Sequence, residues 1–264
     1  MLKIEHIAKT FNPGTIIQKK ALRDLSLELA NGDFVTVIGG NGAGKSTLLN
    51  AVAGVWPVDE GTIEIGGVDV TAMPEYKRAQ YIGRVFQDPM MGTAPNMQIE
   101  ENLALAYRRG KKRTLRWGVT QAERKLFRDQ LATLGLGLED RMTAKVGLLS
   151  GGQRQALTLL MAALQTPKLL LLDEHTAALD PATAAKVLEI SDKIVRDGKL
   201  TALMITHNMT DAIRHGNRLI MMDQGRIVLD ISGEDKQKLT KADLLARFAQ
   251  TTGTQEETDS VLLS

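Results

Sequence analysis

The stretch that decides the fold reads Phe34-Val35-Thr36-Val37-Ile38-Gly39-Gly40-Asn41-Gly42-Ala43-Gly44-Lys45-Ser46-Thr47. Its second part, from Gly39 to Thr47, fits the phosphate-loop pattern G-x-x-x-x-G-K-[ST]. The run from Asp33 to Ile38 predicts a short strand before it, and helical sequence follows over Ser46–Ala53. The glycines allow successive backbone N–H groups to converge on a phosphate, and the helix adds its positive N-terminal end. The pattern therefore predicts a loop that binds a nucleoside triphosphate.

Two side chains of this loop have expected roles of their own. Lys45 is placed to reach the β- and γ-phosphates, and the Ser46 hydroxyl to ligate Mg²⁺. The alternative is a chance match in a chain with 24 glycines. The strand before the loop and the helix after it disfavour chance, so nucleotide and Mg²⁺ are the expected ligands.

Strand and helix patterns on both sides of this loop indicate an α/β protein. Alternating or continuous apolar residues predict strands, and leucines and alanines at helical spacing predict helices between about Met97 and Gln165. The expected strands are Leu2–Phe11, Leu22–Leu29, Asp33–Ile38, Tyr81–Phe86, Leu169–Leu172, Leu200–Thr206 and Arg218–Met222, with a hairpin at Gly66-Gly67 and a helix from Asp180-Pro181 to Gly198. We expect one domain: an α/β core over 1–96 and 166–230, a helical subdomain over 97–165, and a C-terminal helix and tail over 231–264, frayed from Thr251.

A pair of carboxylates, Asp173-Glu174, follows the buried leucine strand directly. Ligands of open parallel sheets bind at such strand ends. Asp173 can hold Mg²⁺ through its water shell, and Glu174 can polarise a water molecule for attack on the γ-phosphate. The alternative is two acidic residues that only solvate a strand end, which is disfavoured by the phosphate loop in the same chain.

A second anion-binding helix start is predicted at Ser150-Gly151-Gly152-Gln153. Ser150 has the properties of a helix N-cap, and the two glycines leave the helix start bare. An ordinary cap is the alternative when the segment is taken alone. Two such helix starts for one triphosphate suggest a composite site that is shared between two copies of the chain.

Composition excludes several classes of protein. The chain of 264 residues has no cysteine, so it has neither disulfides nor thiolate chemistry, and its net charge of +2 gives no global attraction for nucleic acid. The longest apolar runs, Leu157–Leu164 and Leu169–Leu172, fall short of the roughly 18 residues that a membrane-spanning helix needs. We expect a soluble or peripheral protein whose membrane role, if it has one, depends on a partner.

The phosphate loop, Ser150–Gln153, Asp173-Glu174 and Ala178-Leu179-Asp180 occur in the order found in the nucleotide-binding subunits of ABC transporters, and the sequence resembles that family over roughly residues 1 to 230. The resemblance implies a P-loop NTPase (RecA-like) core with an antiparallel β subdomain and an inserted all-helical subdomain. It also implies a head-to-tail dimer in which each ATP lies between one phosphate loop and the partner's signature helix. Because all motifs of this chain are intact, we expect a homodimer.

The same resemblance implies roles for further residues. Gln87 would contact Mg²⁺ and the attacking water, Asp180 would couple the two sites, His207 would hydrogen-bond the γ-phosphate, and Phe11 would stack on the adenine. The structural alternatives are a surface polar residue for Gln87, a helix cap for Asp180, a structural histidine for His207 and a core aromatic for Phe11. His175 departs from the family, where proline or alanine is commoner; tuning of Glu174 by its titration and neutral variation are the two interpretations.

Two surface features concern partners. Arg108 to Arg116 holds six basic residues in nine; lipid headgroups, plain solvation of a loop and, most weakly, nucleic acid are the alternatives. Met90-Met91 and Met97 follow Gln87, where the family contacts its membrane subunit, although methionine also fills cores.

Residues 173 to 181, Asp-Glu-His-Thr-Ala-Ala-Leu-Asp-Pro, resemble a subgroup of bacterial importers linked to aromatic amino acids such as tryptophan or tyrosine. The resemblance implies an ATPase on the cytoplasmic face of the membrane, with separate permease subunits and, indirectly, a substrate-binding protein. A soluble ABC ATPase of iron–sulfur cluster assembly is the alternative. A DNA-repair or translation ABC protein is a third, disfavoured because long coiled-coil inserts and a second ATPase domain are lacking.

Overall fold

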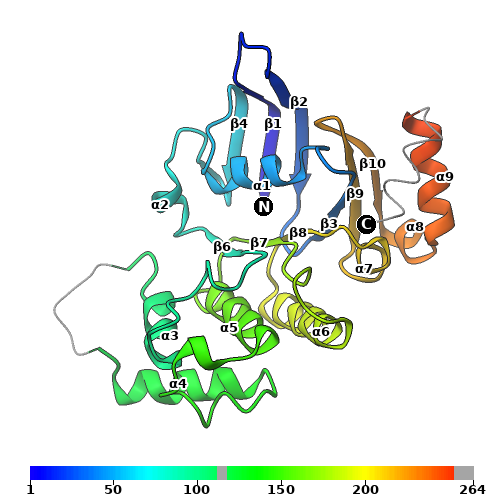
Figure 1. Cartoon of the computed structure of the whole chain (residues 1–264). Coiled ribbons are helices and arrows are strands. Elements are labelled where there is room, and N and C mark those ends of the chain that lie inside the picture. Colours follow the sequence, from blue (N-terminus) through cyan, green and yellow to red (C-terminus); the bar gives the residue numbers. More distant parts are fainter. Residues whose placement is uncertain (112–117, 253–264) are drawn as a thin grey trace. The chain divides into compact units, whose positions relative to one another are not determined.

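The computed structural model describes residues 1–111 and 118–252, and it divides into two compact units (Figure 1). Unit 1 comprises Met1–Tyr81 and Thr201–Ser264, and unit 2 comprises Ile82–Leu200. The expectation of a frayed tail falls largely on residues 253–264, outside the described residues.

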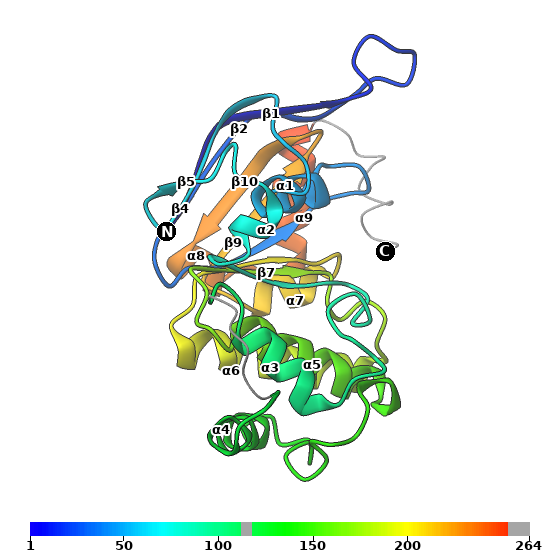
Figure 2. The same ribbon diagram turned by 90° about the vertical axis from the view of Figure 1, so that its left-hand side faces the viewer.

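An antiparallel sheet forms one side of unit 1. Its strands are β1 (Leu2–Phe11), β2 (Lys19–Leu29), β4 (Glu60–Ile65) and β5 (Val68–Asp69), in the order β2-β1-β4-β5. The hairpin between β4 and β5 turns at Gly66 and Gly67, both with positive φ (61° and 83°), as the sequence predicts. The loop between β1 and β2 extends well beyond the paired strands (Figure 2).

A second set of strands in unit 1 carries the phosphate loop. The fully buried strand β3 (Phe34–Ile38) pairs in parallel with β8 (Ala202–Ile205) and with β9 (Arg218–Asp223). A further strand, β10 (Arg226–Ser232), pairs antiparallel with β9, and the sequence analysis did not predict it. Apolar residues of these strands pack against α7 (Met209–Arg214) and α9 (Lys241–Thr252), and the short helix α8 (Gly233–Gln237) contacts β9 and β10.

The helix that follows the phosphate loop is α1 (Lys45–Ala53), and a buried arginine closes its C-terminal end. Arg78, at the end of the short helix α2 (Glu75–Arg78), is 2% exposed and donates from Nη1 to the carbonyls of Ala51 and Val52 at 2.7 and 2.9 Å. Helix ends leave such carbonyls without intrahelical partners. Burial lowers the pKa of Arg78 from its ordinary value. Arg78 thus fixes the far end of the helix whose first turn faces the phosphate loop.

Unit 2 consists of two parallel strands and a group of helices. β6 (Ile82–Val85) pairs with β7 (Leu169–Asp173), and α5 (Gly151–Ala163) packs on β6 and on α6 (Pro181–Gly198). The helices α3 (Ile99–Tyr107) and α4 (Gln121–Ala132) contact each other and α5, and the 3₁₀ turn η1 (Val146–Leu148) precedes α5 (Figure 1). In the described parts of the chain, no helix combines the length and the apolar character needed to span a bilayer.

The α/β class and the helical character of residues 97–165 agree with the sequence analysis, and the C-terminal segment needs a correction. A C-terminal helix and tail were expected over residues 231–264. Ile231 and Ser232 instead complete β10, and α8 and α9 follow as two helices. The strand continues because the turn at Gln224-Gly225, both with positive φ, folds the chain back onto β9.

Candidate nucleotide site

The phosphate loop of unit 1 has the backbone that its glycines permit. Gly39, Gly42 and Gly44 all have positive φ (149°, 83° and 102°), and Gly44 is the N-cap of α1 without any side-chain cap. Lys45 is 7% exposed, and its Nζ donates to the carbonyls of Gly39 and Gly40 at 2.6 and 3.1 Å. The lysine therefore lies across the loop. Asn41 and Ser46 are exposed, Ala43 is buried and Thr47 is half-buried.

At two of these positions glycine is required for two reasons, the positive φ and the lack of space for a Cβ atom. A Cβ on Gly39 would lie 2.2 Å from the carbonyl oxygen of Met222, and one on Gly44 would lie 2.6 Å from that of Ala21. Real Cβ atoms essentially never approach backbone so closely. The loop is thus held between β2 and β9, and its N–H groups are fixed before any ligand binds.

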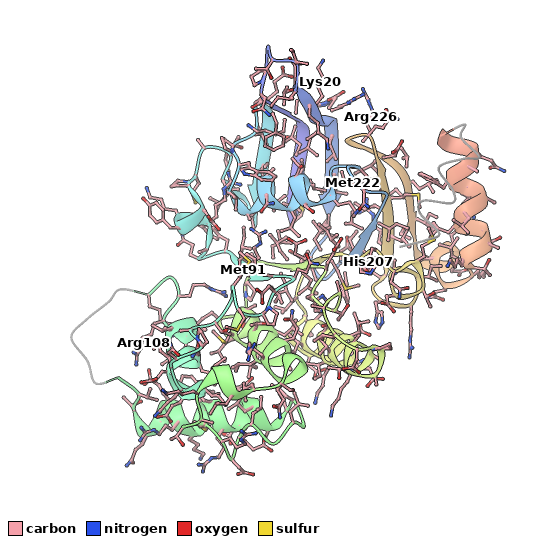
Figure 3. The ribbon with its side chains drawn as sticks, viewed as in Figure 1. Lys20, Met91, Arg108, His207, Met222 and Arg226 are labelled. Atoms are coloured by element: carbon pink, nitrogen blue, oxygen red, sulfur yellow. The ribbon has the colours of Figure 1, made fainter. Side chains whose placement is uncertain are left out.

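His207 lies at the same edge of the unit 1 sheet as the loop. Val37 of β3 is in register with Ile205 of β8, and the N–H of Thr206 donates to the carbonyl of Val37 at 3.1 Å. Because the strands are parallel, Gly39 and His207 follow their strands at one edge. His207 is exposed at the end of β8 (Figure 3). The role of His207 at a terminal phosphate stays a prediction.

Phe11, the expected adenine platform, is half-buried at the end of β1. Its ring packs edge-on against Trp56, with 4.9 Å between centroids and an interplanar angle of 82°. Lys9 Nζ lies 5.8 Å from the same ring centroid. Trp56, which follows α1, was not singled out from the sequence, since nothing in its spacing from Phe11 signals the contact.

In unit 2, the expected catalytic carboxylates and Gln87 come to one edge. Val85 of β6 is in register with Leu172 of β7, so Gln87, Asp173 and Glu174 follow the carboxyl ends of neighbouring parallel strands. Gln87 is exposed, and the two acidic residues are half-buried. Gln155 of α5 is fully buried and donates from Nε2 to the carbonyl of Phe86 at 3.1 Å. That bond fixes the residue directly before Gln87.

The predicted helix start at Ser150 is confirmed as a capping box. The Gln153 N–H donates to Ser150 Oγ, and the Ser150 N–H donates to Gln153 Oε1, both at 3.2 Å. The Ser150 hydroxyl retains its own proton for donation. Arg154, which the sequence analysis did not single out, donates from Nη2 to the carbonyls of Gly147 and Leu149 at 3.1 and 3.0 Å. It fixes the turn that leads into α5.

The two signature glycines touch the segment that leads into α6. A Cβ on Gly151 would lie 3.2 Å from Leu179 Cδ2, and one on Gly152 would lie 2.2 Å from Thr183 Cγ2. Asp180 caps α6 through its Oδ1, which accepts from the Thr183 N–H at 3.1 Å. Hydrogen bonds from Thr183 hold the pKa of Asp180 below its usual range. The starts of α5 and α6 therefore form one packed structure within unit 2.

Magnesium fits the donor types that each unit offers. Unit 1 supplies the Ser46 hydroxyl, and unit 2 supplies the Gln87 amide and the Asp173 carboxylate, all of them oxygen ligands that Mg²⁺ prefers. Within residues 1–111 and 118–252, three or more His, Cys, Asp and Glu residues nowhere gather as a metal-binding group.

The described part of the basic stretch is engaged in contacts within unit 2. Arg108 donates to Glu123 at 3.2 Å and to the carbonyl of Gly118 (Figure 3). Arg109 donates to the carbonyl of Ala162 at 2.9 Å, and burial lowers its pKa. Lys111 Nζ lies 3.6 Å from the Tyr107 ring centroid. Residues 112–116 of the stretch are outside the described residues.

Comparison with known proteins identifies the class that this fold and these motifs define. The family described as ABC transporter matches residues 22–177, so the chain belongs to this family. A solved dimeric ATP-binding cassette in a post-hydrolysis state, bound to ADP and Pi, has 28% identity and a TM-score of 0.74, over 88% of this chain and 98% of that one. The P-loop NTPase fold is confirmed, and the chain is an ABC-family ATPase.

Two relatives are similar over nearly the whole chain. The tyrosine transport ATP-binding protein of Clostridioides difficile (strain R20291) is 44% identical over 257 residues, which are 94% of this chain and 98% of the relative. The methionine import ATP-binding protein MetN 2 of Enterococcus faecalis (strain ATCC 700802 / V583) is 34% identical over 95% of this chain and 70% of its own length. The resemblance to the aromatic amino-acid subgroup is thereby confirmed.

Proposed function

We propose that the chain is the ATP-hydrolysing subunit of a bacterial importer, acting as a head-to-tail homodimer on separate permease subunits. The observation that carries the proposal is the pair of prepared helix starts, α1 with its glycine cap and α5 with its Ser150 capping box. Each favours an anion. A head-to-tail dimer would bring α1 of one copy and α5 of the other to a single triphosphate.

Within such a site each side chain has a defined task. Lys45, the loop from Gly39 to Thr47 and His207 would bind the phosphates, and Phe11 would stack on the adenine. Ser46, Gln87 and Asp173 would hold Mg²⁺, which neutralises developing charge on the phosphates. Glu174 would take the proton of the attacking water as general base. Ser150 to Gln153 would close the site from the partner copy, and Asp180 would couple the two sites.

The membrane partner would dock on unit 2 beside Met90 and Met91. These side chains are 39% and 69% exposed, and Leu148 of η1 is 72% exposed. The carbonyl of Pro95 accepts from the N–H of Gly147 at 2.8 Å, which ties the segment after Gln87 to η1. The exposed methionine and leucine side chains of these two linked stretches suit a helical partner. The chain would thus sit peripherally on the cytoplasmic face of the membrane.

An aromatic amino acid is the proposed cargo, because the relative at 44% identity is a tyrosine transport protein. The relatives disfavour the alternative of iron–sulfur cluster assembly, since both are transport or import subunits by their names. A substrate-binding protein would deliver the cargo to the permease.

The decisive experiment compares the wild type with Glu174→Gln. Loss of the general base should slow ATP hydrolysis by roughly 10²–10⁴-fold, and the variant should form a stable dimer with ATP, measured by light scattering. Glu189→Gln, at an exposed position of α6, is the matched control and should hydrolyse ATP like the wild type. A Glu174→Gln monomer with wild-type turnover would count against the proposal.

The importer assignment needs a second measurement. Capture of the tagged chain from detergent-solubilised membranes should recover an integral membrane protein. The reconstituted complex with its binding protein should accumulate labelled tyrosine or tryptophan in vesicles in an ATP-dependent manner. A partner that is purely soluble would contradict the transport role while leaving the ATPase intact.

A further inference from the structure

The residue after the expected general base, His175, is almost completely buried and is bonded to the helix that follows. It is 2% exposed, and its Nε2 lies 2.9 Å from Ser191 Oγ in α6. Ser191 is also buried, at 1% exposed. A polar pair in such an environment stays together, because separating it would leave two buried polar groups without hydrogen bonds.

The hydrogen-bond pattern defines which atom carries the proton. Ser191 Oγ lies 2.8 Å from the carbonyl oxygen of Val187, one turn earlier in α6, and donates to it. A hydroxyl has a single proton, so toward the imidazole Ser191 Oγ acts as acceptor. The donor is therefore Nε2–H of His175. Any replacement that keeps this bond must supply a donor at the position of Nε2.

The backbone next to this histidine is held in a conformation that needs support. Glu174 has φ of 43°, in the left-handed region, which a residue other than glycine adopts only when the surroundings impose it. On its N-terminal side, Leu172 of β7 pairs with Val85 of β6. On its C-terminal side, the carbonyl of Glu174 accepts from the Ala177 N–H at 3.0 Å in a turn. The His175 side chain adds an anchor to α6 directly beside Glu174.

From this geometry we infer that His175 is a positioning residue: its hydrogen bond to Ser191 anchors the chain to α6 and holds the Glu174 carboxylate where a water molecule can be activated. The inference rests on the proposed role of Glu174 as general base. It assigns to His175 a fixed hydrogen bond in place of the titration effect considered from the sequence.

The test compares two amides that differ in reach. The amide nitrogen of glutamine is four bonds from Cα, as Nε2 of histidine is, and that of asparagine is three bonds away, as Nδ1 is. His175→Gln should keep the bond and retain kcat within about threefold. His175→Asn and Ser191→Ala should each lower kcat about tenfold with KM for ATP within about twofold, since a misplaced catalytic group costs rate more than binding. The double variant should be no slower than either single one, because both remove one interaction.

Val195→Ala serves as the control for a general loss of stability. Val195 is buried one turn further along α6, and its truncation should lower the melting temperature without changing kcat. Equal kcat values for the wild type, His175→Asn and Ser191→Ala overturn the inference; if Glu174→Gln is inactive at the same time, the proposed function stands. A fully active Glu174→Gln overturns both. If His175→Asn does not fold, the kcat of Ser191→Ala compared with that of Val195→Ala decides whether the inference holds.

Discussion

Arg84 of β6 forms an ion pair with Asp173 at the end of β7, with 3.4 Å between Nη2 and Oδ2. The side chains are 13% and 19% exposed, so solvent screens the pair only in part. The guanidinium carbon also lies 4.6 Å from the Phe86 ring centroid, which fixes the arginine in place. A cation is therefore held against the carboxylate that we expect to bind hydrated Mg²⁺.

Removal of this cation should strengthen Mg²⁺ binding. Arg84→Met keeps the length of the side chain without its charge, and Asp173 would then attract Mg²⁺ without competition from this guanidinium. The Mg²⁺ concentration for half-maximal binding of ATP, followed by calorimetry and not by turnover, should fall several-fold. Arg84→Lys, which retains the charge, is the control and should stay near the wild type. An unchanged or higher Mg²⁺ requirement in Arg84→Met would rule out this competition.

The sequence was sufficient to predict those parts of the site whose structure depends on short stretches of consecutive residues. The phosphate loop, the Ser150 capping box and the Asp180 cap each depend on a few consecutive residues whose conformations follow from glycine φ angles and helix-end chemistry. The continuous apolar run before Asp173 likewise indicates a buried parallel strand. These features are all confirmed as local structures.

The contacts that support the site could not be predicted, because they join residues far apart in the chain. Arg84 and Asp173 are 89 positions apart, and Arg78 reaches Ala51 across 27. The partner of His175 is 16 residues away, and that separation has no periodic meaning until α6 packs against the residues that follow β7. The missed strand β10 is different: a turn with Gly225 precedes an apolar stretch from Ile227, so a hairpin signal was present in the sequence.

Substitution of Gly44 should abolish tight nucleotide binding. Gly44→Ala would add a Cβ at φ of 102° and 2.6 Å from the Ala21 carbonyl oxygen, so the loop must move. Affinity for a fluorescent ATP analogue should fall at least tenfold, which corresponds to about 1.4 kcal/mol. Gly67→Ala, at φ of 83° with nothing within 4 Å of the added Cβ, is the matched control. It should lose some stability and bind ATP normally. Equal affinities in the two variants would refute the argument.

The charge of Asp180 should matter for α6 in a defined pH range. Hydrogen bonds from the side chain and the backbone N–H of Thr183 lower its pKa in the folded protein below the ordinary value of 3.8. A carboxylate with a depressed pKa stabilises the fold above its unfolded pKa, and this contribution disappears as the pH falls through the lower, folded value. The negative charge also interacts favourably with the N-terminus of α6. Asp180→Asn keeps a capping oxygen and removes the charge.

We therefore expect the stability of the first turn of α6 to differ between wild type and Asp180→Asn by a constant amount between pH 8 and pH 6. This difference should vanish in the range below about pH 4. Amide hydrogen exchange of Thr183 and Ala184, compared between the two proteins at each pH, measures this locally at the first turn of α6. Because Asp180 is fully exposed, added salt should reduce the difference at pH 7. A difference that grows toward acid pH would mean that the protonated form of Asp180 is the one the fold prefers, contrary to the hydrogen bonds that Thr183 donates to it.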